Sequence, residues 1–187
     1  GNIKVTIENN KYKIGDYVIK RELAFNKDDI FNRSKMVESE RNFTKLAIIQ
    51  LGRVIVDTVI MPDKTINMTV NIALNKKYEL TPGITSVYKA NRLFVGINLE
   101  YKDKDFWGGG RVLRVTAEGL YNSLDINILK AGFSLYQPFL FNNNITATFN
   151  PQVVYANLNE DLQLLAFQNL LRFTYFIADY TFYNNAF

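Results

Sequence analysis

Cysteine and histidine are both absent from this chain of 187 residues. Without cysteine the chain has no disulfide and no thiolate site. Without histidine it lacks the usual neutral-pH base and the commonest metal ligand. Catalytic triads built on these residues are therefore excluded, and no serine stands in a Gly-x-Ser-x-Gly setting. We expect no enzymatic activity, no cofactor and no metal site.

Long apolar runs are absent too, since no stretch reaches the ~18 residues that a membrane-spanning helix needs. No signal peptide opens the chain, because Gly1-Asn2-Ile3 leads directly into a strand-like stretch. If the protein is exported, we expect this sequence to be a mature or excised portion of it.

Three weak signals for chemistry have simpler structural explanations. The pair Asp28-Asp29 is typical of a solvated turn. Gly108-Gly-Gly110 lacks the Lys-Ser/Thr and the helix of a phosphate-binding loop, so a hairpin turn is expected. Basic side chains are interleaved with acidic ones instead of forming a stripe, so we expect no nucleic-acid partner.

Charged and aromatic residues, which are abundant, divide the chain in two. Residues 1–80 hold 14 Lys and Arg and 10 Asp and Glu, whereas residues 81–187 hold 8 of each kind. The aromatic residues of the same two parts number 6 and 20. We therefore expect two physically different domains, 1–80 and 81–187, joined near Leu80-Thr81-Pro82-Gly83.

The first domain has the pattern of a small α+β module. The alternation of Ile3–Ile7 predicts a strand, and Gly15-Asp16 offers a turn and N-cap for a helix over Tyr17–Ala24. The inward residues of that helix are predicted to be Val18, Ile19 and Leu23. Ser34 is expected to cap a second helix running to about Ile48, with one apolar face formed by Met36, Val37, Phe43, Leu46 and Ala47.

Two further strands complete this module. Arg53–Ile60 is rich in β-branched residues, Met61–Lys64 is expected to turn the chain, and Thr65–Ala73 returns. The order is β-α-α-β-β, for which a three-stranded sheet covered by two helices on one face is a stable arrangement. Such a sheet keeps its edge strands, either Ile3–Ile7 or Arg53–Ile60, available for pairing with another chain.

The second domain alternates apolar and polar residues in runs of about ten, which suits tilted membrane strands. The runs lie around Leu93–Tyr101, Leu113–Tyr121, Leu129–Tyr136 and Ile145–Tyr155, and Leu162–Tyr183 is expected to hold two more. A soluble antiparallel sandwich alternates in the same way. The aromatic load, including Phe106-Trp107 at a strand end where an interfacial girdle lies, favours the membrane interpretation.

The segment Tyr17-Val-Ile-Lys-Arg-Glu-Leu-Ala-Phe-Asn-Lys-Asp-Asp-Ile-Phe-Asn32 resembles the POTRA repeat of the Omp85 superfamily, the BamA-like outer-membrane insertases. Val37-Glu-Ser39 and Phe43–Ile49 are similar to the second helix of that repeat. Asp28 stands where the family usually has glycine, and Ala47 and Ile49 replace its usual Gly and Phe. Gly96–Gly110 resembles the family's first barrel hairpin, and Ser134–Phe141 resembles a later strand.

This resemblance implies a POTRA module followed by antiparallel strands of a partial transmembrane β-barrel. It implies a noncatalytic protein of the bacterial outer membrane, with its N-terminal domain in the periplasm, that helps insert β-barrel proteins by strand augmentation. The implied partners are unfolded outer-membrane protein clients, accessory assembly proteins and outer-membrane lipid. The alternatives are a translocation or lipid-transport branch of the superfamily, and a soluble α+β scaffold protein with a β-sandwich second half.

Two groups of residues are expected to carry this function. The residues expected to pair with partner or client strands are Val54, Ile55 and Val56 in the module, and Val95, Ile97 and Leu99 in Leu93–Tyr101, which in the family would be the gate edge. The expected membrane-interface aromatics are Tyr101, Phe106 and Trp107. The family's barrel has far more strands than the roughly six that fit here, so we expect the chain to be part of a longer protein.

Overall fold

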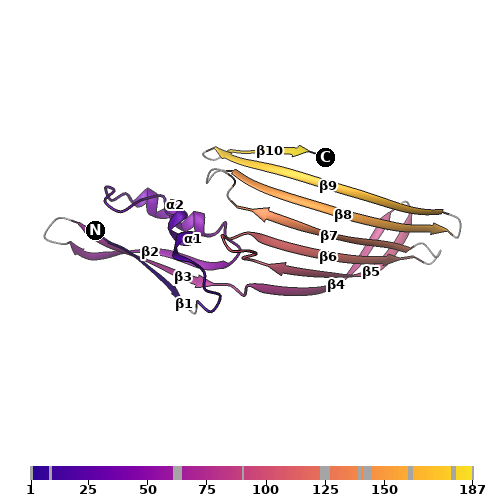
Figure 1. The fold of residues 1–187 in the computed structure, drawn as a ribbon, viewed down its shortest axis with the longest axis horizontal. Coiled ribbons are helices and arrows are strands. Elements are labelled where there is room, and N and C mark those ends of the chain that lie inside the picture. The colour runs from indigo at the N-terminus through magenta and orange to yellow at the C-terminus, as the bar shows by residue number, and fades with distance from the viewer. Residues whose placement is uncertain are drawn as a thin grey trace. The chain divides into compact units, whose positions relative to one another are not determined.

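The computed structural model of the chain describes residues 2–8, 10–60, 65–89, 91–122, 127–138, 140, 145–159, 162–177 and 180–186. These residues form two compact units (Figure 1). Unit 1 contains residues 1–77 together with Trp107–Gly110, and unit 2 contains Tyr78–Phe106 and Arg111–Phe187. The turn expected at Met61–Lys64 lies outside the described residues.

Unit 1 has the predicted β-α-α-β-β order. Its elements are β1 (Ile3–Glu8), α1 (Asp16–Arg21), α2 (Arg33–Phe43), β2 (Ile49–Ile60) and β3 (Ile66–Leu74). The three strands form a sheet in the order β1-β3-β2, in which β3 pairs in parallel with β1 and antiparallel with β2. Both strands that were expected to be edges, β1 and β2, therefore lie at the edges of this sheet (Figure 1).

The helices differ from the prediction at their ends. Asn32, not Ser34, caps α2, because its side-chain oxygen accepts the Ser34 backbone N–H at 2.8 Å. The helix ends at Phe43, well before the expected Ile48, and a turn follows in which the Leu46 N–H donates to the Phe43 carbonyl. Val37, expected on the apolar face, is half-exposed instead.

A single apolar core holds unit 1 together. Its most deeply buried side chains are Val18, Ile19, Phe43, Leu46, Ile48, Val70 and Ile72. Ser39 is the buried polar link between the helices, since its hydroxyl accepts the Ala24 N–H at 2.9 Å and donates to the Lys35 carbonyl at 2.7 Å. Turn, helix and sheet residues thus share one core, as a layered α+β module requires.

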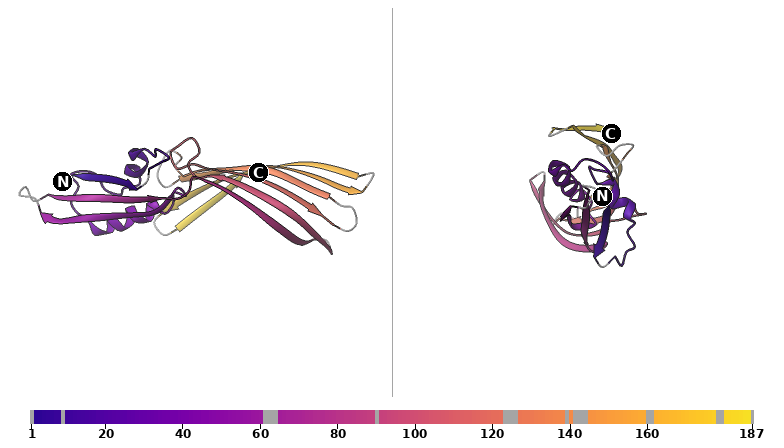
Figure 2. Two further views of the ribbon diagram at one scale, coloured as in Figure 1. Left: turned by 90° about the horizontal axis from the view of Figure 1, so that it is seen from below. Right: turned by 90° about the vertical axis from the view of Figure 1, so that its left-hand side faces the viewer.

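Unit 2 is an antiparallel sheet of consecutive hairpins. Its seven strands are β4 (Tyr78–Lys89), β5 (Arg92–Asp103), β6 (Val112–Tyr121), β7 (Asn127–Gln137), β8 (Ile145–Asn159), β9 (Leu162–Ile177) and β10 (Tyr180–Ala186). Each strand pairs with its sequence neighbours, so the order in the sheet is β10-β9-β8-β7-β6-β5-β4. Figure 2 shows the twist that these long strands develop.

The strand β4 was not predicted. Its Pro82 and Gly83 resemble linker residues in the sequence, and the expected division at residues 80 and 81 falls inside it. In the structure, β4 pairs with β5 in an unbroken register from Tyr78 opposite Asp103 to Lys89 opposite Arg92. A proline is compatible with an edge strand such as β4, because its nitrogen can face away from the one neighbouring strand.

The sheet is open between β4 and β10 across the described strands. The antiparallel sheet is thus as predicted, while its place in a partial transmembrane barrel stays a prediction. Among the helices of the described part, none is long and apolar enough to cross a membrane.

Candidate functional site

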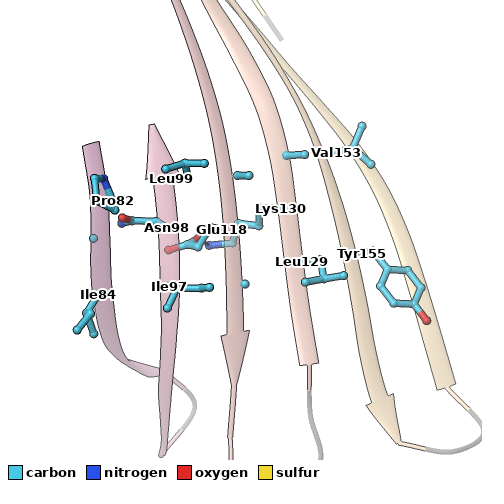
Figure 3. Close-up of a pocket in the computed structure, with 14 residues that line it drawn as sticks. Pro82, Ile84, Ile97, Asn98, Leu99, Glu118, Leu129, Lys130, Val153 and Tyr155 are labelled. Carbon is cyan, nitrogen blue, oxygen red and sulfur yellow. Dashed lines mark hydrogen bonds and ion pairs between the residues drawn. The ribbon is translucent and has the colours of Figure 1, made fainter. Parts of the chain in front are cut away.

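The two faces of the unit 2 sheet have opposite chemistry. Residues directly opposite each other on paired strands share a face, and neighbours along a strand alternate between faces. One register row therefore joins Ile84, Ile97, Gly119, Leu129, Tyr155 and Leu165, and the next joins Pro82, Leu99, Ala117, Ala131, Val153 and Phe167. Figure 3 shows Ile84 on β4 and Ile97 on β5, and beyond β6 it shows Leu129 on β7 and Tyr155 on β8.

This apolar face carries large side chains with high exposure. Ile84 is 85% exposed, Ile97 72% and Phe167 73%. A pocket on the sheet is lined in part by the small residues Ala117 and Gly119, between larger apolar neighbours (Figure 3). Exposed apolar area on this scale marks a surface that normally contacts a membrane or another protein.

The opposite face, the polar face, carries ion pairs between adjacent strands, and it also holds a small apolar cluster of Phe94, Leu120 and Ile128. Glu100 lies 3.3 Å from the Arg114 guanidinium, and Glu118 pairs with Lys130. The Asn98 amide donates to the Thr85 hydroxyl at 2.9 Å. Polar groups facing away from the apolar face are what a membrane strand directs toward an aqueous lumen.

Two glycines let the strands approach closely on this polar face. An added Cβ at Gly96 would overlap the Gly119 carbonyl oxygen of β6, and at Gly132 it would lie 2.8 Å from the Pro151 carbonyl oxygen of β8. Glycines that relieve crowding on one face are a device by which sheets bend toward that face.

The expected pairing residues divide between an edge and an interior strand. Val54, Ile55 and Val56 lie on β2, at an edge of the unit 1 sheet. Val95, Ile97 and Leu99 lie on β5, which pairs with β4 on one side and β6 on the other. The expectation that Leu93–Tyr101 forms the edge was wrong, because Tyr78–Lys89 forms a further strand that occupies this position.

The β2 edge carries its own cap. The Val54 backbone N–H donates to the Glu40 carboxylate of α2 at 2.9 Å. In an antiparallel strand, alternate residues direct their backbone groups to opposite sides. Val54 therefore belongs to the outward set with Val56, while Ile55 directs its backbone groups to β3. The sequence holds no signal for this contact, since Glu40 and Val54 are separated by the whole helix-to-strand turn.

The three expected interface aromatics occupy different settings. Tyr101 lies on the apolar face, and its ring stacks on that of Tyr78 with centroids 6.4 Å apart. Phe106 follows β5, and its N–H donates to the Arg111 carbonyl at 2.9 Å. Trp107 is 80% exposed, has a left-handed backbone with φ +54°, and belongs to unit 1 by its contacts. Tyr78 is an aromatic partner that the prediction missed.

Unit 1 also contains a buried carboxyl group. Glu22 is 2% exposed, and its side chain lies 3.3 Å from the Arg21 guanidinium. Burial raises the pKa of Glu22 to about 7, although the positive charges of Arg21 and Lys45 oppose this effect. Among the described residues, no three His, Cys, Asp or Glu side chains gather in a way that would hold a metal ion.

Comparison with known proteins now identifies the first unit. Residues 3–77 match the POTRA family, described as the surface antigen variable number repeat, and unit 1 is a POTRA domain. Among curated proteins, none matches the chain.

Two solved structures are similar to the chain over almost its whole length. CdiB from Acinetobacter baumannii has 9% identity and a TM-score of 0.51, and the match covers 99% of this chain and 46% of that one. BamA from Haemophilus ducreyi lacking POTRA domains 1–3 has 12% identity and a TM-score of 0.45, and the match covers 96% of this chain and 44% of that one. The chain thus spans less than half the length of either structure.

A POTRA domain followed by an antiparallel sheet is the order that the sequence resemblance implied. The family match identifies the POTRA domain, and the likeness to CdiB shows the fold.

Proposed function

We propose that this chain is part of an outer-membrane protein that inserts β-barrel proteins, with the sheet of unit 2 in the bilayer and the POTRA domain in the periplasm. The apolar face carries the proposal. It is continuous across the strands, and large side chains such as Ile97 and Phe167 are largely exposed on it. Contact between these apolar side chains and lipid is favourable, whereas their contact with water is not.

The alternative of a soluble β-sandwich requires a second sheet over the apolar face. The described strands of unit 2 all belong to one sheet, so within this part of the chain nothing forms that second layer.

Two strand edges suit the capture of an extended client. β2 is an edge of the POTRA sheet, and β4 is an edge of the unit 2 sheet. A client strand that adds to an edge gains main-chain hydrogen bonds independent of its sequence, which suits an assembly protein with many clients. Accessory assembly proteins would use the same kind of pairing on the POTRA domain.

Disulfide trapping tests this function, and the absence of cysteine makes each introduced thiol unique. The probe is an unfolded small outer-membrane protein with a single cysteine in its C-terminal strand. We expect Ile55→Cys on β2 and Ile84→Cys on β4 to trap it. The matched control is Ile97→Cys, since this residue lies directly opposite Ile84 on the same face but on an interior strand.

Equal trapping at all three positions would contradict strand capture at an edge. Trapping at Asn98→Cys, on the polar face, without trapping at Ile84→Cys would instead indicate that the client lies in a channel lined by the polar face. That result would favour the translocation or lipid-transport branch.

A further inference from the structure

A polar pocket lies at the end of the POTRA sheet from which the chain leaves for β4. The ends of all three strands of unit 1 contribute to it, through Glu8 of β1, Gln50 of β2 and Leu74 of β3. Its remaining lining residues are Asn10, Lys11, Tyr12, Ala73, Asn75 and Lys76. The pocket therefore combines hydrogen-bond donors with two ammonium groups.

Positive charge dominates this pocket. Lys11 and Lys76 are both exposed, and in the described part of the chain neither has a carboxylate within ion-pair distance. Glu8 supplies the one carboxylate among the lining residues. Lys11 places its ammonium 5.0 Å from the centre of the Tyr12 ring, which keeps the charge over the pocket.

The Tyr12 hydroxyl lies within reach of both lysines. Its pKa is lowered chiefly by a hydrogen bond from the Lys77 backbone, against the opposing effect of desolvation, and the hydrogen bond from Lys11 and the charges of Lys11 and Lys76 add smaller contributions. An environment that stabilises a phenolate also attracts other anions.

Lys76 is close to the first residue of β4 along the chain. Lys76 precedes Tyr78, the first residue of β4, by two residues, so their Cα atoms lie at most ~7 Å apart in any arrangement of the units. Tyr78 stacks on Tyr101, and stacked tyrosines at a strand end are typical of the membrane–water interface. Lysines beside such an interface are attracted to anionic headgroups.

We propose that this pocket binds the phosphate of an anionic phospholipid headgroup, with Lys11 and Lys76 as its cationic partners and Tyr12 as a hydroxyl donor. The proposal rests on the membrane location of unit 2 described above. Binding would anchor the POTRA domain at the bilayer surface by a contact that clients and partner proteins do not use.

The test measures how fast lysines of the full chain are acetylated in lipid nanodiscs. One set of discs contains phosphatidylcholine alone, and the other contains equal parts of phosphatidylcholine and phosphatidylglycerol. We expect phosphatidylglycerol to slow the acetylation of Lys11 and Lys76 by about fivefold each, the protection that headgroup attraction gives a single lysine. Lys20 and Lys27, which are also exposed, serve as internal controls and should change little.

A variant and a soluble probe sharpen the result. Because one phosphate contacts both lysines, Lys76→Gln should abolish the protection of Lys11, whereas the matched variant Lys27→Gln should leave it intact. Glycerol 3-phosphate added to phosphatidylcholine discs should give no protection. Protection by glycerol 3-phosphate equal to that by phosphatidylglycerol would overturn the assignment to lipid.

Two other outcomes also overturn the inference. Equal rates in both discs would exclude the site while leaving the proposed function intact, and equal protection of all four lysines would show only a general surface charge effect. A chain that does not enter the discs, scored separately by size-exclusion chromatography, would contradict the membrane location and this inference together.

Discussion

At the scale of single residues, Gly96 shows how one missing side chain allows two strands to approach closely. Its Cα faces the backbone of β6 so closely that a methyl group would overlap the Gly119 carbonyl oxygen. By contrast, a methyl group at Gly119, on the opposite face, would lie 3.5 Å from the Leu129 side chain, an ordinary van der Waals distance. Gly96 and Gly119, which lie on adjacent strands, thus have different steric roles.

We predict that Gly96→Ala destabilises the unit 2 sheet by about 1–3 kcal/mol, the usual cost of overpacking. The group that the new methyl would overlap is backbone, which cannot rotate away as a side chain can. Gly119→Ala should cost little. The measurement is the urea midpoint of the β-sheet circular dichroism signal in detergent micelles. Equal midpoints for the two variants would show that the close approach at Gly96 is not needed.

Glu22 is the second residue with a specific consequence, because its folded pKa of about 7 lies above the ordinary value of 4.5. Between these two values the folded chain holds a proton that the unfolded chain releases. The stability of unit 1 is therefore expected to fall as the pH rises from about 4.5 to about 7, by up to about 3 kcal/mol, and to change no further above that range.

Glu22→Gln should remove this dependence and make unit 1 more stable than the parent at about pH 8. Urea unfolding followed through the amide signals of Val70 and Ile72 at about pH 5 and about pH 8 measures both effects. A slope of the opposite sign in the parent chain, or an unchanged slope in the variant, would exclude Glu22 as the titrating group.

At the scale of elements, the contact between α2 and β2 decides whether the POTRA edge is open. Glu40 of α2 occupies the Val54 N–H, which a client strand would need for pairing. Edge strands are often protected against unwanted pairing, and a carboxylate that caps one outward donor provides such protection. Client capture at β2 therefore requires Glu40 to be displaced.

We predict that Glu40→Ala speeds hydrogen exchange at the Val54 amide and raises the yield of client trapping by Ile55→Cys. The lost hydrogen bond should cost unit 1 about 0.5–1.5 kcal/mol, the usual net contribution of one hydrogen bond. Glu40→Gln, which keeps an acceptor oxygen, is the matched control and should resemble the parent. An unchanged trapping yield in Glu40→Ala would show that the cap does not limit access to the edge.

The prediction of elements from sequence succeeded where local periodicity matches burial. The alternating runs around Leu93–Tyr101 and Leu129–Tyr136 became β5 and β7 because each strand has one apolar and one polar face. β4 was missed because Pro82 and Gly83 disfavour a strand locally. Pairing with all of β5, in register from Tyr78 to Lys89, overrides that preference.

At the scale of the whole molecule, the question is whether the apolar face contacts lipid. Ile97 and Asn98 are sequence neighbours on β5, both are exposed, and they lie on opposite faces of the sheet. In a bilayer, a lysine on the lipid face costs about 2–4 kcal/mol at mid-depth, while a lysine on the lumen face costs little. In water, by contrast, a lysine at either position is well solvated.

We therefore predict that Ile97→Lys strongly reduces folding of the chain into lipid vesicles, whereas Asn98→Lys does not. Protease protection of the vesicle-associated sheet measures the difference. If Ile97→Lys instead leaves vesicle folding unchanged and improves solubility in the absence of lipid, the membrane location fails and the soluble alternative gains support.

The sequence by itself determined the β-α-α-β-β order of the POTRA domain and the two faces of the later strands, because both follow from periodicities within a few residues. The tertiary structure alone decided which strand forms the edge of the unit 2 sheet, that Tyr78 stacks on Tyr101, and that Glu40 caps Val54. It also placed Lys11 and Lys76 at one pocket. These features join residues far apart in the chain, and local propensity carries no information about such contacts until strand register is set.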